Sequence, residues 1–114
     1  MTSLLLGLDV GTTAVKALVF DMVGNVVASA SCGCDLLTPQ QGWVEQDPED
    51  LWRGVLQTVR SVTEQISPGD RLVALSQSSQ GGTTIPLDAL GQPVYHAMSW
   101  MDERAGEQLS LIHI

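Results

Sequence analysis

The chain has 114 residues, of which 44% are hydrophobic, enough for one modest domain with its own core. Thirteen acidic residues against five basic ones give a formal charge of -8, which argues against a nucleic-acid partner. No apolar run is long enough to span a bilayer, and the Met1-Thr2-Ser3 start lacks the basic region of a signal peptide. We therefore expect a cytoplasmic protein with no membrane partner.

The first third of the chain predicts an antiparallel meander. Continuous apolar residues over 4–10 predict a strand buried on both faces. The turn at 11–13 leads into a second predicted strand over 14–20. The loop 21–25 supplies Gly and Asn where a hairpin needs positive φ, and a third strand is expected over 26–32.

A long helix is predicted after an irregular connection over 35–46. Asp47 is suited to cap this helix and Pro48 to occupy its first position, while the acidic residues that follow favour the positive end of the helix dipole. The helix is expected to end at 67–70. Its apolar stripe recurs at helical spacing: Leu51, Trp52, Val55, Leu56, Val59, Val62 and Ile66.

The second half predicts shorter elements. Strands are expected over 72–75 and 83–87, separated by the polar segment 76–82. An extended segment follows at 93–96, and 100–105 reads as a loop that enters a short helix. The fold class is therefore α/β with a mixed sheet that opens with a meander.

Several conspicuous side chains are interpreted as structural. Cys32 and Cys34 point to one face of a strand and are expected to be reduced thiols. Trp43 lies next to the helix cap and Trp52 on the apolar stripe, and both are interpreted as packing residues and not as recognition residues. His96 lies far from the cysteines in sequence, so no metal site is predicted from these groups.

Asp9 is the first candidate for chemistry. A carboxylate at the end of an apolar strand must be solvated, paired or linked to a metal ion. It could equally accept hydrogen bonds from its own turn, as Asp before Gly often does. The turn Gly11-Thr12-Thr13 is expected to add three backbone donors and two hydroxyls, and Lys16 on the next strand is within reach. The pattern lacks the Gly-Lys-Ser/Thr ending and following helix of a Walker loop.

Three segments carry a resemblance to a known family. Residues 7–13, with Lys16 and Phe20-Asp21, resemble the first phosphate motif of the actin-like ATPase superfamily. Residues 42–52 are similar to the segment before the first long helix of the FGGY carbohydrate kinases, which include xylulokinase, gluconate kinase and glycerol kinase. Residues 100–105 resemble the Trp-x-Asp-x-Arg element of that family.

The resemblance implies an ATP-dependent kinase that acts on a sugar or polyol, built from ribonuclease-H-like domains. It covers residues 4 to about 108 in the correct order. Because members of this family are far longer than this chain, the domain is expected to be incomplete. Asp9 would act through Mg²⁺, and Gly11, Thr12, Thr13 and Lys16 would face the phosphates of ATP. Such sites work by positioning and charge stabilisation at the transferred group.

The resemblance also implies a substrate side, with candidates Gln80, Gly81, Gly82, Trp100 and Asp102. Typical xylulokinases carry Gly-Gln-Met-His-Gly near the first three of these residues, and glycerol kinases Gln-Arg-Glu-Thr. This chain keeps the glutamine but has two glycines in place of those side chains, which weakens both assignments. The alternatives are that the glycines form a plain turn and that the tryptophan is a core anchor.

No general base stands out, and the resemblance implies that the base and the adenosine site lie further along a longer chain. We expect residues 1–108 to be the amino-terminal part of the first kinase domain and 109–114 to be a non-native or truncated apolar tail. The chain alone is expected to be inactive and prone to associate, and the longer protein could be a homodimer. Two other hypotheses stay open: a non-catalytic actin-like module that binds nucleotide or sugar, and a member of the repressor/kinase family.

Overall fold

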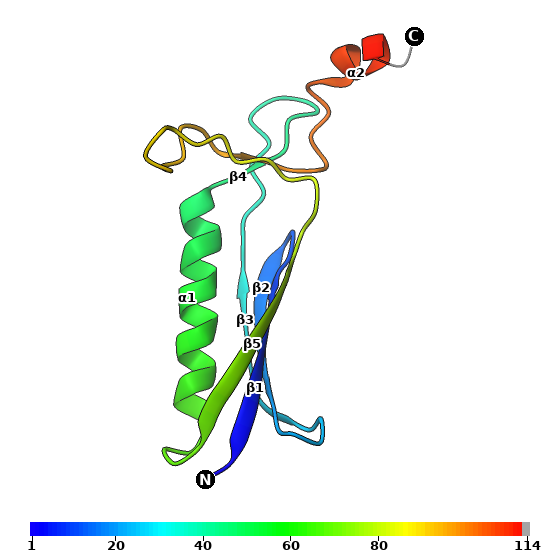
Figure 1. Ribbon diagram of the computed structural model, residues 1–114. Coiled ribbons are helices and arrows are strands. Elements are labelled where there is room, and N and C mark those ends of the chain that lie inside the picture. Colours follow the sequence, from blue (N-terminus) through cyan, green and yellow to red (C-terminus); the bar gives the residue numbers. More distant parts are fainter. Residues whose placement is uncertain (113–114) are drawn as a thin grey trace. The chain divides into compact units, whose positions relative to one another are not determined.

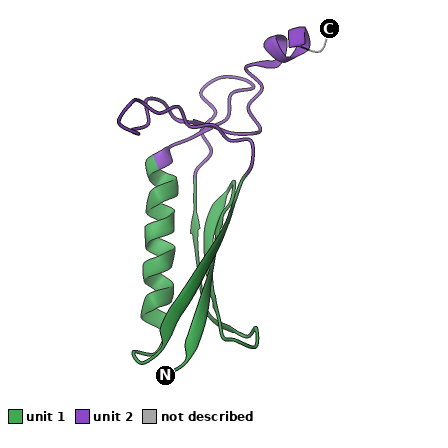
Figure 2. Ribbon diagram, viewed as in Figure 1, with its two compact units in different colours: residues 1–34, 49–80 green, residues 35–48, 81–114 purple. Residues whose placement is uncertain are grey.

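The computed structural model describes residues 1–112, which form two compact units (Figure 2). Unit 1 consists of residues 1–34 and 49–80, and unit 2 consists of residues 35–48 and those from 81 onward. Each unit therefore combines two separate stretches of the chain.

Unit 1 is a four-stranded mixed sheet with one long helix on it (Figure 1). The strand order is β3-β2-β1-β5, in which β1 is antiparallel to β2 and parallel to β5. The elements are β1 (Ser3–Val10), β2 (Ala14–Phe20), β3 (Val26–Gly33), α1 (Pro48–Gln65) and β5 (Arg71–Ser79). The predicted meander and mixed sheet are confirmed.

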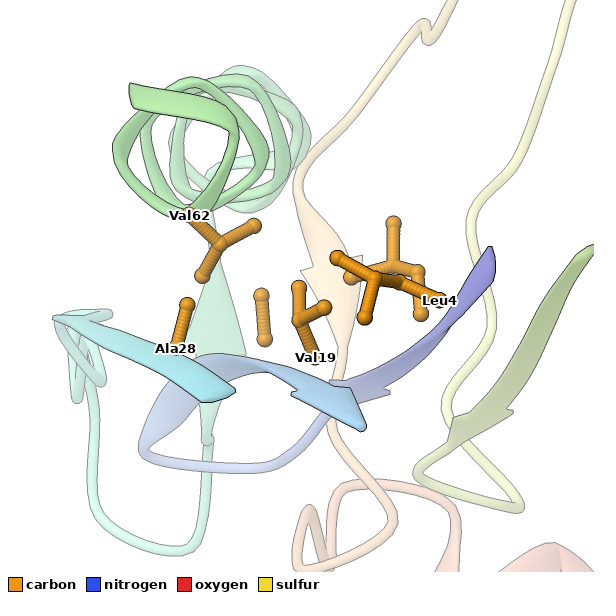
Figure 3. Close-up of a cluster of buried hydrophobic side chains, with 6 residues drawn as sticks. Leu4, Val19, Ala28 and Val62 are labelled. Atoms are coloured by element: carbon orange, nitrogen blue, oxygen red, sulfur yellow. The ribbon is translucent and has the colours of Figure 1, made fainter. Parts of the chain in front are cut away.

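The core of unit 1 lies between α1 and one face of the sheet (Figure 3). Alternate residues of each strand point to this face, so it gathers small and branched side chains. Val62 projects from the helix toward the strands that carry Leu4, Val19 and Ala28 (Figure 3). The buried cluster consists of Leu4, Leu6, Ala17, Val19, Ala28 and Val62.

The prediction that β1 is buried on both faces is wrong. Leu4 and Leu6 are buried, whereas Leu5 and Gly7 are only partly buried and Asp9 is exposed. Among residues 1–112, α1 is the helix that packs on this sheet, and it covers one face. A continuous apolar run therefore has its alternate residues in different environments.

Helix α1 begins at Pro48, as predicted from the cap and the proline. Gly54 allows it to approach β2 closely, because a Cβ there would lie 2.9 Å from Val15 Cγ2. Thr58 is buried and its hydroxyl donates to the Gly54 carbonyl at 2.9 Å. Trp52 is 57% exposed, so its assignment to the apolar stripe is wrong.

The β2–β3 hairpin is held by Asp21. Its carboxylate accepts hydrogen bonds from the Val23 and Asn25 backbone N–H groups and from the Asn25 side chain. The Asn25 side-chain hydrogen bond is the main reason that the pKa of Asp21 is lowered. Gly24 alone in this loop has positive φ, at 94°, so the expectation of positive φ at Asn25 is wrong.

Strand β5 is longer than predicted. It pairs in parallel with β1 as far as Val10↔Ser79, so the polar residues 76–79 belong to the strand. Their polarity hid the strand because they lie on an exposed edge, where burial does not select apolar side chains.

Unit 2 contains β4 (Glu45–Gln46), β6 (Ala97–Met98) and α2 (Gly106–Ile112). The connection over 35–46 was expected to be irregular, yet it contains β4, which pairs with β6. The predicted strand over 83–87 is wrong, because only isolated bridges form there and proline at its fourth position lacks a backbone donor. The short helix after residue 105 is confirmed.

Cys32 and Cys34 are free thiols, as predicted. No helix within the described residues is long and apolar enough to cross a membrane. Residues 109–112 lie in α2 with Leu109, Leu111 and Ile112 exposed, while residues 113–114 of the expected tail lie outside the described residues. The non-native origin of that tail stays a prediction.

Candidate functional site

The predicted phosphate turn joins β1 and β2 in unit 1. Asp9 and Lys16 are direct partners in the antiparallel register, and both are exposed. Since cross-strand partners share one face of a sheet, the Asp9 and Lys16 side chains start from neighbouring positions on the same face. They lie on the face opposite the core, because the neighbouring Val15 and Ala17 are buried against α1.

A pocket of about 320 Å³ lies on this open face. Asp9 and Lys16 line it together with Ser76 and Ser78 of β5, the latter being the register partner of Asp9. The other lining residues are Gly7, Leu8, Leu18 and Gln77. The pocket thus combines one acid, one base and two hydroxyls, a set suited to a phosphate group with a cation.

Gly11 forms the turn rather than offering its backbone donor. Its N–H donates to the Ala14 carbonyl at 3.0 Å, so the expectation of three backbone donors in this turn is wrong for Gly11. A Cβ at this position would lie 2.9 Å from the same carbonyl oxygen, which explains the need for glycine. Thr12 is partly buried and Thr13 is exposed, and the Thr13 carbonyl accepts the Cys34 N–H at 2.9 Å.

Gln80 adjoins the phosphate turn directly. Its backbone N–H donates to the Val10 carbonyl at 2.9 Å, and its side-chain Nε2 donates to the Gly11 carbonyl at 3.3 Å. Unit 1 therefore brings one predicted substrate residue against the predicted phosphate residues. The sequence did not predict this contact, because the two residues lie 69 positions apart and local spacing carries no information about such pairs.

The acid in the pocket is compatible with a magnesium ion shared with phosphates. Mg²⁺ is usually held by one or two carboxylates, with phosphate oxygens and water completing its shell. Asp9 is an exposed carboxylate on the pocket wall and fits this requirement. No group of three or more His, Cys, Asp or Glu side chains within residues 1–112 forms an all-protein metal cage.

Unit 2 contains a buried network of charges that the sequence analysis missed. Glu45 is 2% exposed, and its carboxylate accepts the Tyr95 hydroxyl at 2.6 Å and Arg104 Nη2 at 2.6 Å. His96 Nδ1 lies 3.1 Å from the other oxygen. Asp102 accepts hydrogen bonds from Arg104 Nε at 2.9 and 3.0 Å and from Nη2 at 2.7 Å.

The network keeps both carboxyl groups ionised. Burial alone raises the pKa of Glu45, but hydrogen bonds from Tyr95, Arg104 and His96 outweigh burial and lower it. Hydrogen bonds from Arg104 hold the pKa of Asp102 well below its usual range. The bonds to Asp102 and Glu45 raise the pKa of Arg104, which stays protonated.

Asp102 uses both of its carboxylate oxygens within the chain. Besides Arg104, the Val44 backbone N–H donates to Oδ2 at 2.7 Å. The Arg104 guanidinium also lies 4.0 Å from the centre of the Trp43 ring, a cation–π contact. Trp43 therefore packs as predicted, whereas Asp102 offers less acceptor capacity to a sugar hydroxyl than expected.

Trp100 lies in the same unit as this network. The residue is 56% exposed, so the alternative of a core anchor is wrong. Its backbone N–H donates to the Thr83 hydroxyl at 3.2 Å. Gly82 has φ of 77°, and a Cβ there would lie 3.2 Å from Trp100 Cβ, while Gly81 faces open space. Gly82 therefore allows the chain to approach Trp100 closely, whereas Gly81 has no neighbour near its missing Cβ.

One feature of the sequence could have singled out Glu45 and Arg104 as functional residues. Both lie inside the segments that carry the family resemblance, and Arg104 is one of only five basic residues in an acidic chain. Their pairing could not be predicted, because they are separated by 59 residues.

A mixed sheet with a phosphate-type turn between its first two strands defines the class of ribonuclease-H-like, actin-like domains. The model of the FGGY family of carbohydrate kinases, N-terminal domain, matches residues 4–113. The chain belongs to this family, which confirms the resemblance and the fold class.

Relatives and solved structures agree with this assignment. The chain is 44% identical over 104 residues to a glycerol kinase from Paracidovorax citrulli, covering 89% of this chain and 20% of that protein. A gluconate kinase structure from Lactobacillus acidophilus matches with a TM-score of 0.92 and 29% identity, over 99% of this chain and 23% of that one. A xylulose kinase from the same organism matches with a TM-score of 0.91 and 30% identity, over 97% and 22%. The chain therefore spans about a fifth of the length of its relatives.

Proposed function

We propose that the protein to which this chain belongs transfers the γ-phosphoryl group of ATP to a hydroxyl of a sugar or polyol. Family membership supports the reaction class. The observation that carries the proposal is the contact of Gln80 Nε2 with the Gly11 carbonyl at 3.3 Å. It joins a candidate acceptor residue to the candidate phosphate turn, as phosphoryl transfer requires of its donor and acceptor sites.

On the side of the phosphoryl donor, the chain would supply charged groups, hydrogen-bond donors and a narrow turn for the phosphates of ATP. Asp9 would hold Mg²⁺ together with the phosphates, and Lys16 would neutralise a phosphate oxygen. Thr12 and Thr13 would donate hydrogen bonds to the phosphates, while Gly11 keeps the turn narrow. The bound metal ion would stabilise negative charge on the transferred group.

The candidate acceptor residues are assigned roles separately in each unit: Gln80 of unit 1 would orient a substrate hydroxyl, and Trp100 of unit 2 would pack against an apolar sugar face. Gly81 would leave space for substrate where a side chain would otherwise stand, and Gly82 would let the chain pass close to Trp100. Asp102 would serve this side mainly through the turn that it orders, since its oxygens already accept hydrogen bonds from Arg104 and Val44. Relatives named for glycerol, gluconate and xylulose support the class of a sugar or polyol without choosing among them.

The activity is proposed for a longer protein, because the chain spans about a fifth of its relatives' length. The general base and most of the adenosine site would come from other parts of that protein. A cytoplasmic location, where ATP is available, and assembly as a homodimer belong to the same proposal.

A binding module without catalysis is the second candidate. Asp9 is the only acidic residue among those that line its pocket, so the described residues offer no base beside it. This observation favours binding without transfer for the chain by itself.

The test is ATP consumption by the longer protein with a panel of polyols, sugars and sugar acids. We expect at least one compound to stimulate consumption and Asp9→Asn to lower the rate by about 10²-fold, the usual scale for losing an electrostatic group in a transition state. The matched control is Asp35→Asn at an exposed site in unit 2. Stimulation by no compound, or equal rates for Asp9→Asn and wild type, would overturn the proposal.

A further inference from the structure

We propose that Glu45 is a positioning residue that fixes the turn presenting Trp100 to substrate. Glu45 acts through Arg104 and Asp102, not by touching the substrate. The inference rests on the proposed function, since it takes Trp100 as part of the sugar or polyol side.

The first step is that Glu45 anchors three separate side chains. Its carboxylate is buried and binds Tyr95, His96 and Arg104 at 2.6, 3.1 and 2.6 Å. Arg104 is held further by the ring of Trp43 at 4.0 Å. The guanidinium therefore has one well-defined position in unit 2.

Arg104, held in place by Glu45, in turn fixes the position of the Asp102 carboxylate. Its planar fork binds both carboxylate oxygens, a geometry that a fixed guanidinium imposes on its partner. The Asp102 backbone N–H in turn donates to the Ser99 carbonyl at 2.9 Å, which closes a turn around Trp100. Ser99 is buried, and its own N–H donates to the Val44 carbonyl at 2.9 Å.

The third step is that Trp100 remains exposed within this ordered turn. Residues on both sides of it are anchored, since Ser99 is 4% exposed and the Asp102 side chain 7%, whereas Trp100 is 56% exposed. Close packing of Gly82 against its Cβ limits the path of the chain beneath the indole. The backbone that carries this exposed aromatic side chain is therefore ordered before a ligand binds, which lowers the entropy cost of binding.

The free energy of burying charges favours a positioning role for the Glu45–Arg104–Asp102 network over a stabilising one. A buried ion pair recovers little more than its own desolvation cost, and apolar residues of similar size often stabilise a fold as well or better. In some proteins a buried polar network instead fixes a unique geometry, and this is the role that we infer here. The network is joined to the Trp100 turn through Asp102, so that turn is where the geometry matters.

The experiment is ¹⁹F NMR of the longer protein to which this chain belongs, labelled with 5-fluorotryptophan. Trp→Phe variants at positions 52 and 100 assign the two resonances that the test compares. We expect Glu45→Gln to shift and broaden the Trp100 resonance while the Trp52 resonance in unit 1 stays unchanged. Glu45→Asp should restore the signal in part, because it keeps the charge. Glu64→Gln, at an exposed site on α1, is the matched control and should change neither resonance.

A Trp100 resonance that is unchanged in Glu45→Gln would overturn the inference. If this variant does not fold, Arg104→Lys replaces it, because lysine keeps the charge but loses the two-oxygen fork. An unchanged Trp100 resonance in Arg104→Lys would overturn the inference equally.

Titration with glycerol, xylitol and D-gluconate separates this inference from the proposed function. We expect one compound to shift the wild-type Trp100 resonance and Glu45→Gln to weaken its binding about tenfold. No response from the wild type would contradict the substrate assignment of Trp100, while the ligand-free spectra would still decide whether Glu45 orders its turn. A response with equal affinity in Glu45→Gln would overturn the positioning role.

Discussion

Replacing Gly54 with alanine tests how closely α1 approaches the sheet that carries the candidate phosphate turn. The added Cβ would lie 2.9 Å from Val15 Cγ2, 3.3 Å from Val15 Cβ and 3.6 Å from Cys34 Sγ. The first distance is shorter than any normal carbon–carbon contact, and Val15 is fully buried, so it has little room to move.

Two opposing effects set the magnitude. Overpacking a core costs about 1–3 kcal/mol. Alanine favours a helix interior over glycine by about 1 kcal/mol. The difference predicts that Gly54→Ala lowers the free energy of unfolding by roughly 0–2 kcal/mol, with the best estimate near 1.

Urea denaturation followed by circular dichroism measures this change. In a Val15→Ala background the clash is absent, and Gly54→Ala should then stabilise the chain by up to about 1 kcal/mol. The two variants should therefore be coupled by about 1–3 kcal/mol, within the range known for residues in contact. Glu64→Ala, at an exposed helix position, should change stability by less than about 0.5 kcal/mol. A stabilising effect of Gly54→Ala in the wild-type background would show that α1 lies further from β2 than described.

Three further predictions concern the two candidate sites. Gly11→Ala should disrupt the turn, because its Cβ would lie 2.9 Å from the rigid Ala14 carbonyl oxygen; loss of Mg-ATP binding by calorimetry checks this, and unchanged affinity would contradict it. Arg104→Met should destabilise the chain by about 3–5 kcal/mol, because it leaves Glu45 and Asp102 buried without a counter-charge; a small change in urea denaturation would refute this. The pKa values of both carboxyl groups are lower in the folded state than in the unfolded state, so their contribution is present above the ordinary carboxyl pKa of about 4 and is lost as pH falls below it. Thermal unfolding should show this loss, and Asp102→Asn should reduce its slope with pH.

Local signals explain what could be predicted. The meander and α1 depend on short-range features: adjacent strands, a hairpin loop and the Asp47-Pro48 start of a helix. Asp9 and Lys16 were recognised because they flank one tight turn. Each of these features is contained within about two neighbouring elements.

Long-range pairing explains what could not be predicted. Strands β4 and β6 have two residues each, too few for any periodic pattern. Each is a strand only because it pairs with the other. The exposure of Trp52 and Trp100 depends on what covers them, which sequence spacing does not encode. Gln80 looked like part of a polar loop, although its amide binds the phosphate turn.

The interleaving of the two units has a consequence for synthesis on the ribosome. The residues that partner Glu45 follow it by 50, 51 and 59 positions. Unit 1 needs no residue beyond 80, so its sheet and helix can form while Glu45 still lacks every one of those partners. We expect stalled nascent chains to resist protease in unit 1 first and to gain protection over 35–48 only after Arg104 has left the exit tunnel.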